Sequence, residues 1–464
     1  MIARLALLLG AASLAGCSLA PGYTRPESPV PAEWPAGDAY LRQSEAALPA
    51  YSYRDVFADP RLRAVVDRAL ANNEDVRIAL ANIAAARAQY RIQRAELLPE
   101  LGAGAGYRRS RTGSGAADDA FAADASIPGY ELDLFGRVRS LTGAARERYL
   151  ASEAAGRGVR LALVADVADA WIAYGLDSSL LAIARRTAET ARESVRLTQR
   201  RLDGGIAPRS DLRQAQIVLE TAEADVANQT TLVAQDLNAL RLLVGAEVEP
   251  ALLPASVEDA GARLREVPAG LDSAILLRRP DVIEAEHRLR AANAEIGAAR
   301  AALFPKITLT GLLGFASDAL GALFDGGSFH WLAGGDASYA IFRGGAGRAG
   351  VAQSEAQRDA ALAAYRKAIE SAFADVSDTL ARRGTIDAQL RAARAGRAAA
   401  ADNLHLAELR YRGGVDSYLG ELTARQSLYS AERALAATER LRAANLVALY
   451  RALGGDPLAG APES

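Results

Sequence analysis

One segment of the chain has the glycine spacing of a dinucleotide-binding loop. Residues Gly345 to Gly350 read Gly-Ala-Gly-Arg-Ala-Gly, which fits G-x-G-x-x-G, and Glu370 follows at the separation of a ribose-binding acid. Such a site needs a uniformly apolar parallel strand before the glycines and a βαβ unit around them. Here the preceding residues alternate in character, and the equivalent segment Phe135-Gly136-Arg137 lacks the spacing. Glycines at a bend from strand to helix explain the motif better, so no cofactor is expected.

The residue types of metal-dependent and hydrolytic catalysis do not cluster in the sequence. The chain contains 3 histidines, and the spacing of His287, His330 and His405 fits no metal site. No Ser-His-Asp set and no catalytic pair of carboxylates can be assigned. The sequence therefore indicates a protein that is not an enzyme.

The single cysteine, Cys17, has a position that fits covalent lipid attachment. It follows Arg4, the apolar stretch Leu5–Leu14 and small residues, which together form a secretory signal. The block Leu-Ala-Gly-Cys ending at Cys17 resembles a bacterial lipobox, in which the cysteine becomes the acylated first residue. Each buried acyl methylene contributes about 0.8 kcal/mol, so several chains would anchor the protein firmly. Ser18 favours delivery to the outer membrane by the same resemblance. A plain signal peptide that contains a cysteine is the alternative.

The composition argues against a nucleic-acid binder and against a helical membrane protein. The 464 residues carry a formal charge of −2, and only 6% are aromatic. A nucleic-acid binder would normally carry a basic patch. After the N-terminal signal, no apolar run is long enough for a transmembrane helix. The abundance of alanine instead predicts helices that approach one another closely.

The same sequence pattern occurs twice along the chain. Asp75–Leu101 aligns without a gap with Asp281–Ile307, and Arg201–Ile206 matches Arg410–Val415. A duplication of this extent predicts one domain made of two equivalent halves around an axis or a pore. The expected boundaries are a signal peptide (1–16), a lipidated extended strap (17–55), a first repeat (56–250), a linker (251–270), a second repeat (271–456) and a tail (457–464).

Each repeat is predicted to contain a helix, two strands, a long helix and a shorter returning helix. The helices before the strands are expected at Pro60–Leu98 and Leu271–Phe304. Alternating residues predict four strands, at Leu101–Ser110, Ala125–Phe135, Ile307–Phe315 and Trp331–Phe342. The absence of proline predicts long helices at Arg137–Asp203 and Ala346–Arg412, which end at glycine pairs and are followed by helices Pro208–Val244 and Asp416–Leu453.

The length and number of the predicted strands bear on whether they lie in water or in a membrane. Each has about ten residues, the length of a membrane-spanning β-strand. Four strands cannot close a barrel, and open edges are not tolerated in lipid. Either the strands lie in water as two hairpins, or several chains share one barrel. A secreted lipoprotein with alternating strands favours the shared barrel.

Three segments together resemble the TolC-like outer-membrane efflux protein family. They are CSLAPGYTRPESPVPAEWP (Cys17–Pro35), YELDLFGRVR (Tyr130–Arg139) and YRGGVDSYL (Tyr411–Leu419). The lipoprotein (NodT-like) branch, which serves RND-type tripartite efflux systems, is the most similar. The resemblance implies an α+β membrane protein whose homotrimer forms a twelve-stranded outer-membrane β-barrel continuous with a long periplasmic α-helical barrel.

The function implied by this resemblance is a passive exit duct for drugs, metals or other small molecules. The duct would receive them from an inner-membrane RND-type pump through a periplasmic adaptor protein, which would dock at Gly204, Gly205, Gly413 and Gly414. The alternative is a periplasmic or surface coiled-coil lipoprotein scaffold without pore activity.

The resemblance also implies a gate near the helix turns. Asp211 matches the family's carboxylate at the start of the returning helix, while Arg410 and Tyr411 match its basic and tyrosine partners on the opposite long helix. Bonds from a guanidinium and a phenol to a carboxylate would clamp the helix pairs together. The alternative is that Asp211 only stabilises the N-terminus of its own helix.

The expected constriction departs from the family pattern. The positions of the family's pore-facing aspartates hold Gly420 and Thr423, while Leu419 matches an apolar ring position. Glu421 is the nearest acid, and in a trimer it would form a ring of like charges. An acidic and an apolar constriction both stay open.

Overall fold

The computed structural model of the chain describes residues 19–31, 33–35, 52–111, 113, 117–265 and 273–455. Cys17, the signal peptide and the tail lie outside the described residues. The chain forms two compact units. The first contains the described residues within 1–27, 81–154 and 283–367, and the second contains those within 28–80, 155–282 and 368–464.

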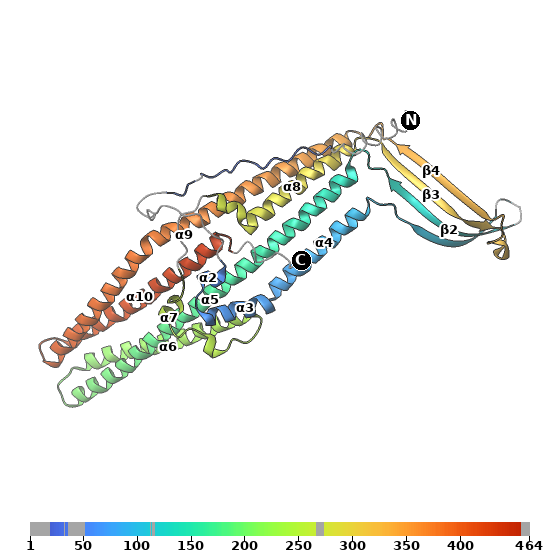
Figure 1. Ribbon diagram of the computed structural model, residues 1–464. Helices are drawn as coiled ribbons and strands as arrows, with labels where there is room; N and C mark the ends of the chain where they lie inside the picture. The colour runs from blue at the N-terminus through green and yellow to red at the C-terminus, as the bar shows by residue number, and fades with distance from the viewer. Residues whose placement is uncertain are drawn as a thin grey trace. The chain divides into compact units, whose positions relative to one another are not determined.

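The strands of the first unit form one antiparallel sheet in the order β1-β2-β3-β4 (Figure 1). Their bounds are β1 Gly102–Ser110, β2 Asp118–Glu131, β3 Lys306–Ser317 and β4 Phe329–Ser338. Strand β2 begins well before the predicted Ala125, because Asp118 and Asp119 pair with the end of β1 instead of forming a turn. The Tyr107 hydroxyl donates to the Asp119 carboxylate at 2.8 Å across this pair.

The strand register places apolar side chains on one face of the sheet, since directly paired residues point to the same side. Leu313 is paired with Ala125 of β2 and with Trp331 of β4, and Phe315 is paired with Ala123 and Phe329. The opposite face carries mainly polar or small residues, among them Gly104, Asp124, Thr308, Thr310, His330 and Asp336, and the paired Leu312 and Leu332 are the exception. The sheet therefore has one apolar and one polar side.

The helices follow the predicted order in both repeats. Their bounds are α2 Tyr53–Val56, α3 Pro60–Asn72, α4 Glu74–Ala95, α5 Arg137–Asp203, α6 Arg209–Val244, α7 Val257–Gly261, α8 Pro280–Ala301, α9 Ala346–Arg412 and α10 Tyr418–Ala452. Helices α5 and α9 each contain 67 residues, and the sequence predicted their bounds correctly. Short 3-10 helices occupy Pro250–Leu252, Ser273–Arg278 and Leu320–Ala322. None of the described helices is both long and apolar enough to span a membrane.

The predicted single helix from Pro60 to Leu98 is wrong, because Asn73 divides it. The Asn73 side-chain oxygen accepts from the backbone N–H groups of Asp75 and Val76 and so caps α4. The amide nitrogen of the same side chain donates to the Leu243 carbonyl of α6 at 2.9 Å. One polar residue thus ends α3, begins α4 and fixes both against the returning helix.

The core of the second unit surrounds Trp171 of α5, whose side chain is completely buried. Its indole N–H donates to the Leu252 carbonyl at 2.9 Å, and the Arg61 guanidinium lies over the ring. One turn later, a Cβ on Gly175 would lie 2.9 Å from the Ser256 carbonyl oxygen. Glycine at this position lets the linker segment pack directly on α5.

Residues 19–27 of the strap lie on α8 within the first unit. Arg25 donates two hydrogen bonds to Glu286, at 3.0 and 2.7 Å, and Asn293 donates to the Pro21 carbonyl. These contacts hold the extended segment against the second repeat although it has no secondary structure of its own.

The glycine motif at Gly345 forms a bend, as predicted. Gly344 and Gly345 have positive φ angles of 57° and 87° between β4 and α9. A Cβ on Gly347 would lie 2.7 Å from the Leu303 side chain, so this glycine allows close packing. Strand β4 is antiparallel to β3, so the motif does not sit in a parallel βαβ unit.

Candidate functional site

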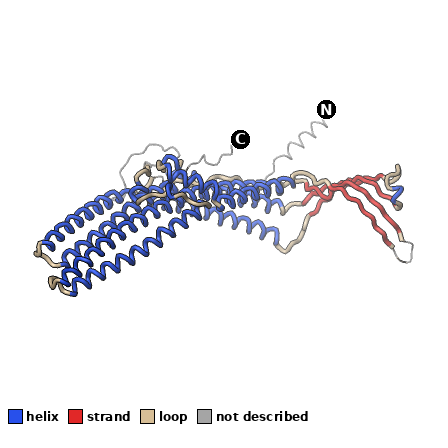
Figure 2. The backbone as a smooth tube through the Cα atoms, turned by 90° about the horizontal axis from the view of Figure 1, so that it is seen from below, coloured by secondary structure: helices blue, strands red, loops and turns tan. Residues whose placement is uncertain are grey.

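A short turn joins each long helix to its returning helix (Figure 2), and the two turns have the same backbone structure. Gly205 and Gly414 have φ angles of 71° and 70°. The N–H of Ile206 donates to the Arg201 carbonyl, and the N–H of Val415 donates to the Arg410 carbonyl. Both are left-handed helix terminations that require glycine. The predicted turns are confirmed, while their role in binding an adaptor stays a prediction.

Within the single chain, the predicted clamp residues Asp211 and Arg410 bond to residues close to them in the sequence and not to each other. Asp211 is half-buried in the first turn of α6, with Ser210 next to it. The Arg410 guanidinium bonds to Asp416 at 3.2 Å instead. Between the described residues, no hydrogen bond or ion pair joins Asp211 to Arg410 or Tyr411. The clamp stays a prediction for the assembled protein.

Tyr411 links the two helix hairpins through its ring. The Arg201 guanidinium of α5 lies 4.7 Å from the centre of this ring, and the Tyr418 ring of α10 lies 5.5 Å away. A cation over an aromatic face contributes about 0.5–1 kcal/mol at an exposed site. Tyr411 therefore already contacts the opposite hairpin, although through Arg201 and not through Asp211.

The predicted constriction residues lie on two different faces of α10. Leu419 and Thr423 are four positions apart, so they share one face, and both are exposed. Glu421 lies on the opposite face and is buried, with 6% of its surface exposed. A pore-facing ring of Glu421 carboxylates does not fit this placement, because the side chain points into the helix pair.

Glu421 belongs to a charged network that the sequence analysis missed. Arg425 bonds to Glu421 at 2.6 Å and to Glu408 of α9 at 2.7 Å. The guanidinium bonds to both carboxylates and so ties α9 to α10 beside the turn. The spacing of Glu421 and Arg425 by four residues was a visible signal for one half of this network.

A second missed contact joins α6 to α10 further from the turns. The Tyr429 hydroxyl donates to Asp225 at 2.5 Å. Burial, together with this hydrogen bond, raises the pKa of Tyr429 to about 12. The bond connects the returning helices of the two repeats, and no local pattern in the sequence indicates it.

A hollow of about 220 Å³ lies beside this bond, lined by Thr190, Ser194, Tyr418, Arg425 and Tyr429.

The described residues contain no group of three or more metal-binding side chains that could hold an ion. His287 lies 2.7 Å from Glu147 through Nδ1, which is a helix-to-helix contact in the first unit. The described structure thus presents two aligned helix hairpins and an amphipathic sheet with two unpaired edges.

Comparison with known proteins defines the class. The family model described as outer membrane efflux protein matches residues 65–246 and 271–455. The chain belongs to the outer membrane efflux protein family.

Individual relatives of the chain are also outer-membrane efflux proteins or channels. The probable efflux pump outer membrane protein TtgC of Pseudomonas putida is 44% identical over 460 residues, which cover 97% of this chain and 95% of the relative. The outer membrane protein OprJ of Pseudomonas aeruginosa is 41% identical over 455 residues, covering 97% and 95%. The open state of the Neisseria gonorrhoeae MtrE outer membrane channel superposes with a TM-score of 0.85 at 36% identity, covering 95% of this chain and 98% of MtrE.

These similarities establish the function at the level of the family. The protein is an outer-membrane channel of an efflux system. They do not favour the alternative of a coiled-coil scaffold without pore activity.

Proposed function

We propose that three copies of this chain share one twelve-stranded β-barrel in the outer membrane, continuous with a periplasmic barrel built from their helices. The observation that carries this proposal is the sheet, which has one apolar face and two edge strands, β1 and β4, without partners. Unpaired backbone groups cost several kcal/mol each in hydrocarbon, so a lipid-embedded sheet must close. Four strands are too few to close alone, and pairing between copies satisfies both edges.

The apolar face would contact lipid and the polar face would line the duct. Leu313, Phe315 and Trp331 supply the lipid-facing side, while Asp124, Thr308 and Thr310 supply the water-facing side. A transmembrane barrel requires this alternation along every strand. The contribution of β1 is weaker, with Ala103, Ala105 and Tyr107 on the apolar side.

The channel would act as the passive exit duct of a tripartite efflux system, without a catalytic step. A periplasmic adaptor docking at Gly204, Gly205, Gly413 and Gly414 would connect it to an inner-membrane RND-type pump. Relatives at 44% identity are named for efflux of toluene and of antibiotics. Organic solvents and antibiotics are therefore the cargo we propose, delivered by the pump and not selected by the duct. Acylation of Cys17 would add a lipid anchor.

The gate would lie at the helix turns. Leu419 and Thr423 share the exposed face of α10, so they would form the constriction, while Asp211, Arg410 and Tyr411 would clamp the hairpins in the shut state. The clamp requires Arg410 to exchange its present partner Asp416 for Asp211. An exchange of one carboxylate partner for another keeps one ion pair in each state, so its net free energy should be small, which suits a gate that must open.

Reconstitution of the purified protein in planar bilayers tests the proposal. Stepwise conductance from a species with the mass of a trimer is expected. A protein that inserts and conducts as a monomer would contradict the shared barrel, and a folded trimer without conductance under gate-opening conditions would contradict the duct.

A further inference from the structure

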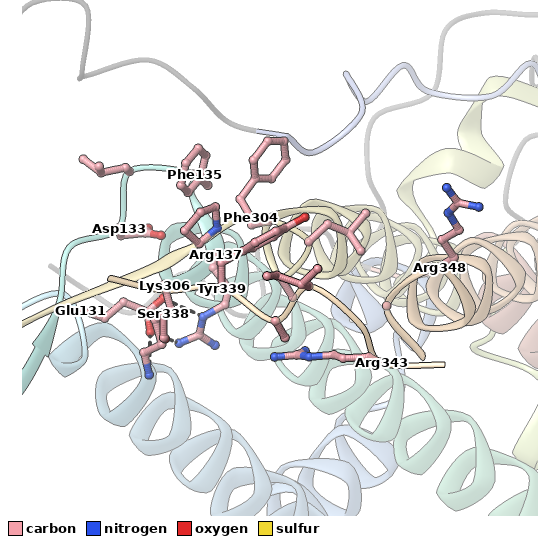
Figure 3. Close-up of a pocket in the computed structure, with 18 of the residues that line it drawn as sticks. Glu131, Asp133, Phe135, Arg137, Phe304, Lys306, Ser338, Tyr339, Arg343 and Arg348 are labelled. Atoms are coloured by element: carbon pink, nitrogen blue, oxygen red, sulfur yellow. Dashed lines mark hydrogen bonds and ion pairs between the residues drawn. The ribbon is translucent and has the colours of Figure 1, made fainter. Parts of the chain in front are cut away.

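Beyond the end of β4, the chain exposes large apolar side chains without covering them. Ile341 is 92% exposed and Phe342 is 89% exposed, and Tyr339 lies next to them. These residues border a hollow of about 780 Å³, together with Phe135 and Phe304 (Figure 3). An isoleucine and a phenylalanine that lie side by side and are both this exposed form an apolar patch beside the hollow. Such a patch is unusual on a surface that stays in water.

The same hollow carries uncompensated positive charge. Arg137 and Lys306 both bond to Glu131, at 2.7 and 3.2 Å, so their charges are shared with that carboxylate. Asp133 also lines the hollow, and its carboxylate is paired with Arg139. Arg343 and Arg348 complete the charged lining, and neither has an ion pair with any of the described residues. Its occupant should therefore be apolar and should carry a negative charge.

The chain itself contains a segment of this chemistry at the opposite edge of the sheet. Between α4 and β1, Leu98 is 72% exposed and Leu101 is 79% exposed. Glu100 lies between them, exposed and without a bonded partner among the described residues. The segment Leu98–Leu101 thus offers two apolar side chains and one carboxylate.

Strand direction brings these two segments together when copies of the chain join. Strand β1 begins at Gly102, directly after Leu101, and β4 ends at Ser338, directly before Tyr339. If β4 of one copy pairs with β1 of the next in the antiparallel sense of the rest of the sheet, the end of β4 meets the start of β1. Residues 98–101 of one copy then lie beside residues 339–343 of its neighbour.

We propose that this hollow is a socket for the Leu98–Leu101 segment of a neighbouring copy, with Glu100 bound by Arg343 or Arg348. The inference rests on the proposed shared barrel and deepens it, because it assigns the contact that fixes strand register between copies. Register between two edge strands is weakly specified where their side chains are small, as they are in β1. An apolar and charged socket at the base of the strands would set that register.

Disulfide trapping tests the contact directly. In a Cys17→Ser background, which leaves no other cysteine, the combined Leu98→Cys and Phe342→Cys substitutions should give disulfide-linked dimers and trimers on non-reducing gels. Each single substitution should give none, because residues 98 of different copies do not meet. A trimer by light scattering in which the cysteine pair forms no intermolecular disulfide would overturn the socket while leaving the shared barrel intact. A protein that forms no trimer would instead remove the proposed barrel itself.

A charge-reversal cycle tests the chemistry without cysteine. Glu100→Arg alone, and Arg343→Glu with Arg348→Glu, should each lower the fraction of SDS-resistant trimer severalfold, and the combination should restore it. Asp325→Arg, the same charge change at the far end of the strands, should have no effect.

The same cycle separates the socket from a lipid site. An anionic phospholipid would also satisfy the two arginines and the exposed apolar residues. If Glu100→Arg leaves the trimer unchanged while the arginine reversals strip co-purified anionic phospholipid from it, the occupant is lipid and the proposal is wrong.

Discussion

The turns of the two repeats have nearly identical backbones but different side-chain chemistry. In the first, the buried position on the returning helix is Leu212, while Gln199 bonds to Asp203 and Gln216 bonds to Arg213. In the second, the equivalent residues are Glu421, Glu408 and Arg425, which form an ion triad. Duplication preserved the glycine terminations, because only glycine fits their positive φ, while the contacts around them diverged. The first turn is fixed by apolar packing and the second by charge, so the second can respond to a change of partners.

The largest expected effect concerns the proposed gate between these turns. Asp211→Ala combined with Tyr411→Phe should raise single-channel conductance, because every copy in the trimer would lose the bonds that hold the gate shut. Charge-assisted bonds of this kind contribute about 1.5–3 kcal/mol each. Thr221→Ala is the control and should change conductance little, because Thr221 is exposed on α6 and among the described residues its hydroxyl bonds only to the Ile217 carbonyl of the same helix. If the double variant stays a trimer and conducts like the wild type, Asp211 is only a helix-terminal residue.

The charged triad gives the next effect. Arg425→Ala leaves Glu421 buried without a partner and should cost about 3 kcal/mol of unfolding free energy, at the low end for a broken buried pair. Copying the first repeat, with Glu408→Gln, Glu421→Leu and Arg425→Gln together, should be neutral or stabilising, because the buried charges disappear as a set. Chemical denaturation followed by circular dichroism measures both. Arg412→Ala, which removes an exposed guanidinium paired with Glu408, should change stability by less than about 1 kcal/mol.

The shared backbone of the turns predicts equal effects in the two repeats. Gly205→Ala and Gly414→Ala should each cost about 1–2 kcal/mol, since alanine is strained at a positive φ near 70°. Gly396→Ala, within α9 and with open space around its Cβ position, should instead stabilise by about 0.5–1 kcal/mol. Thermal unfolding distinguishes these outcomes. A large difference between the two turn variants would mean that one turn carries strain that the other does not.

The regular parts of this fold were predictable from local sequence. Helices α5 and α9 have the predicted bounds because neither contains a proline and a glycine pair follows each one. The division at Asn73 was missed, although Asn followed by Glu74 and Asp75 is a common helix start. Strand β2 was placed too late because paired aspartates usually mark turns. Here a cross-strand hydrogen bond from Tyr107 holds Asp119 in the sheet.

The site was less predictable, because its contacts depend on which helices face one another. Glu421 was expected near the pore, and its burial follows from a position that is apolar in the other repeat, at Leu212. A comparison of the two repeats would have shown this. The bond from Tyr429 to Asp225 joins residues more than two hundred positions apart and has no local signal.

The smallest expected effect comes from another position at which the repeats differ. Asp236 of α6 corresponds to Asn445 of α10, which donates to the Thr379 carbonyl. Asp236 instead lies next to Asp177 of α5, with Arg440 of α10 also nearby. Burial, together with the neighbouring Asp177 carboxyl, raises the pKa of Asp236 to about 7, while the unfolded chain has the ordinary value near 4.

The raised pKa of Asp236 makes the stability of the second unit depend on pH. A carboxyl whose pKa is higher in the folded state stabilises the fold fully below pH 4, and this contribution is lost as the pH rises through 7. Both aspartates are only half-buried, and solvent screening at that exposure reduces the expected loss to about 1 kcal/mol. Asp236→Asn, which copies the second repeat, should remove this part of the pH dependence and make the protein more stable than the wild type at pH 8. Denaturation between pH 4 and 8 measures the slope, with the exposed Asp402→Asn as a control that should keep it. An unchanged slope in Asp236→Asn would show that the two carboxyls do not share a proton and that the repeats are electrostatically equivalent at this position.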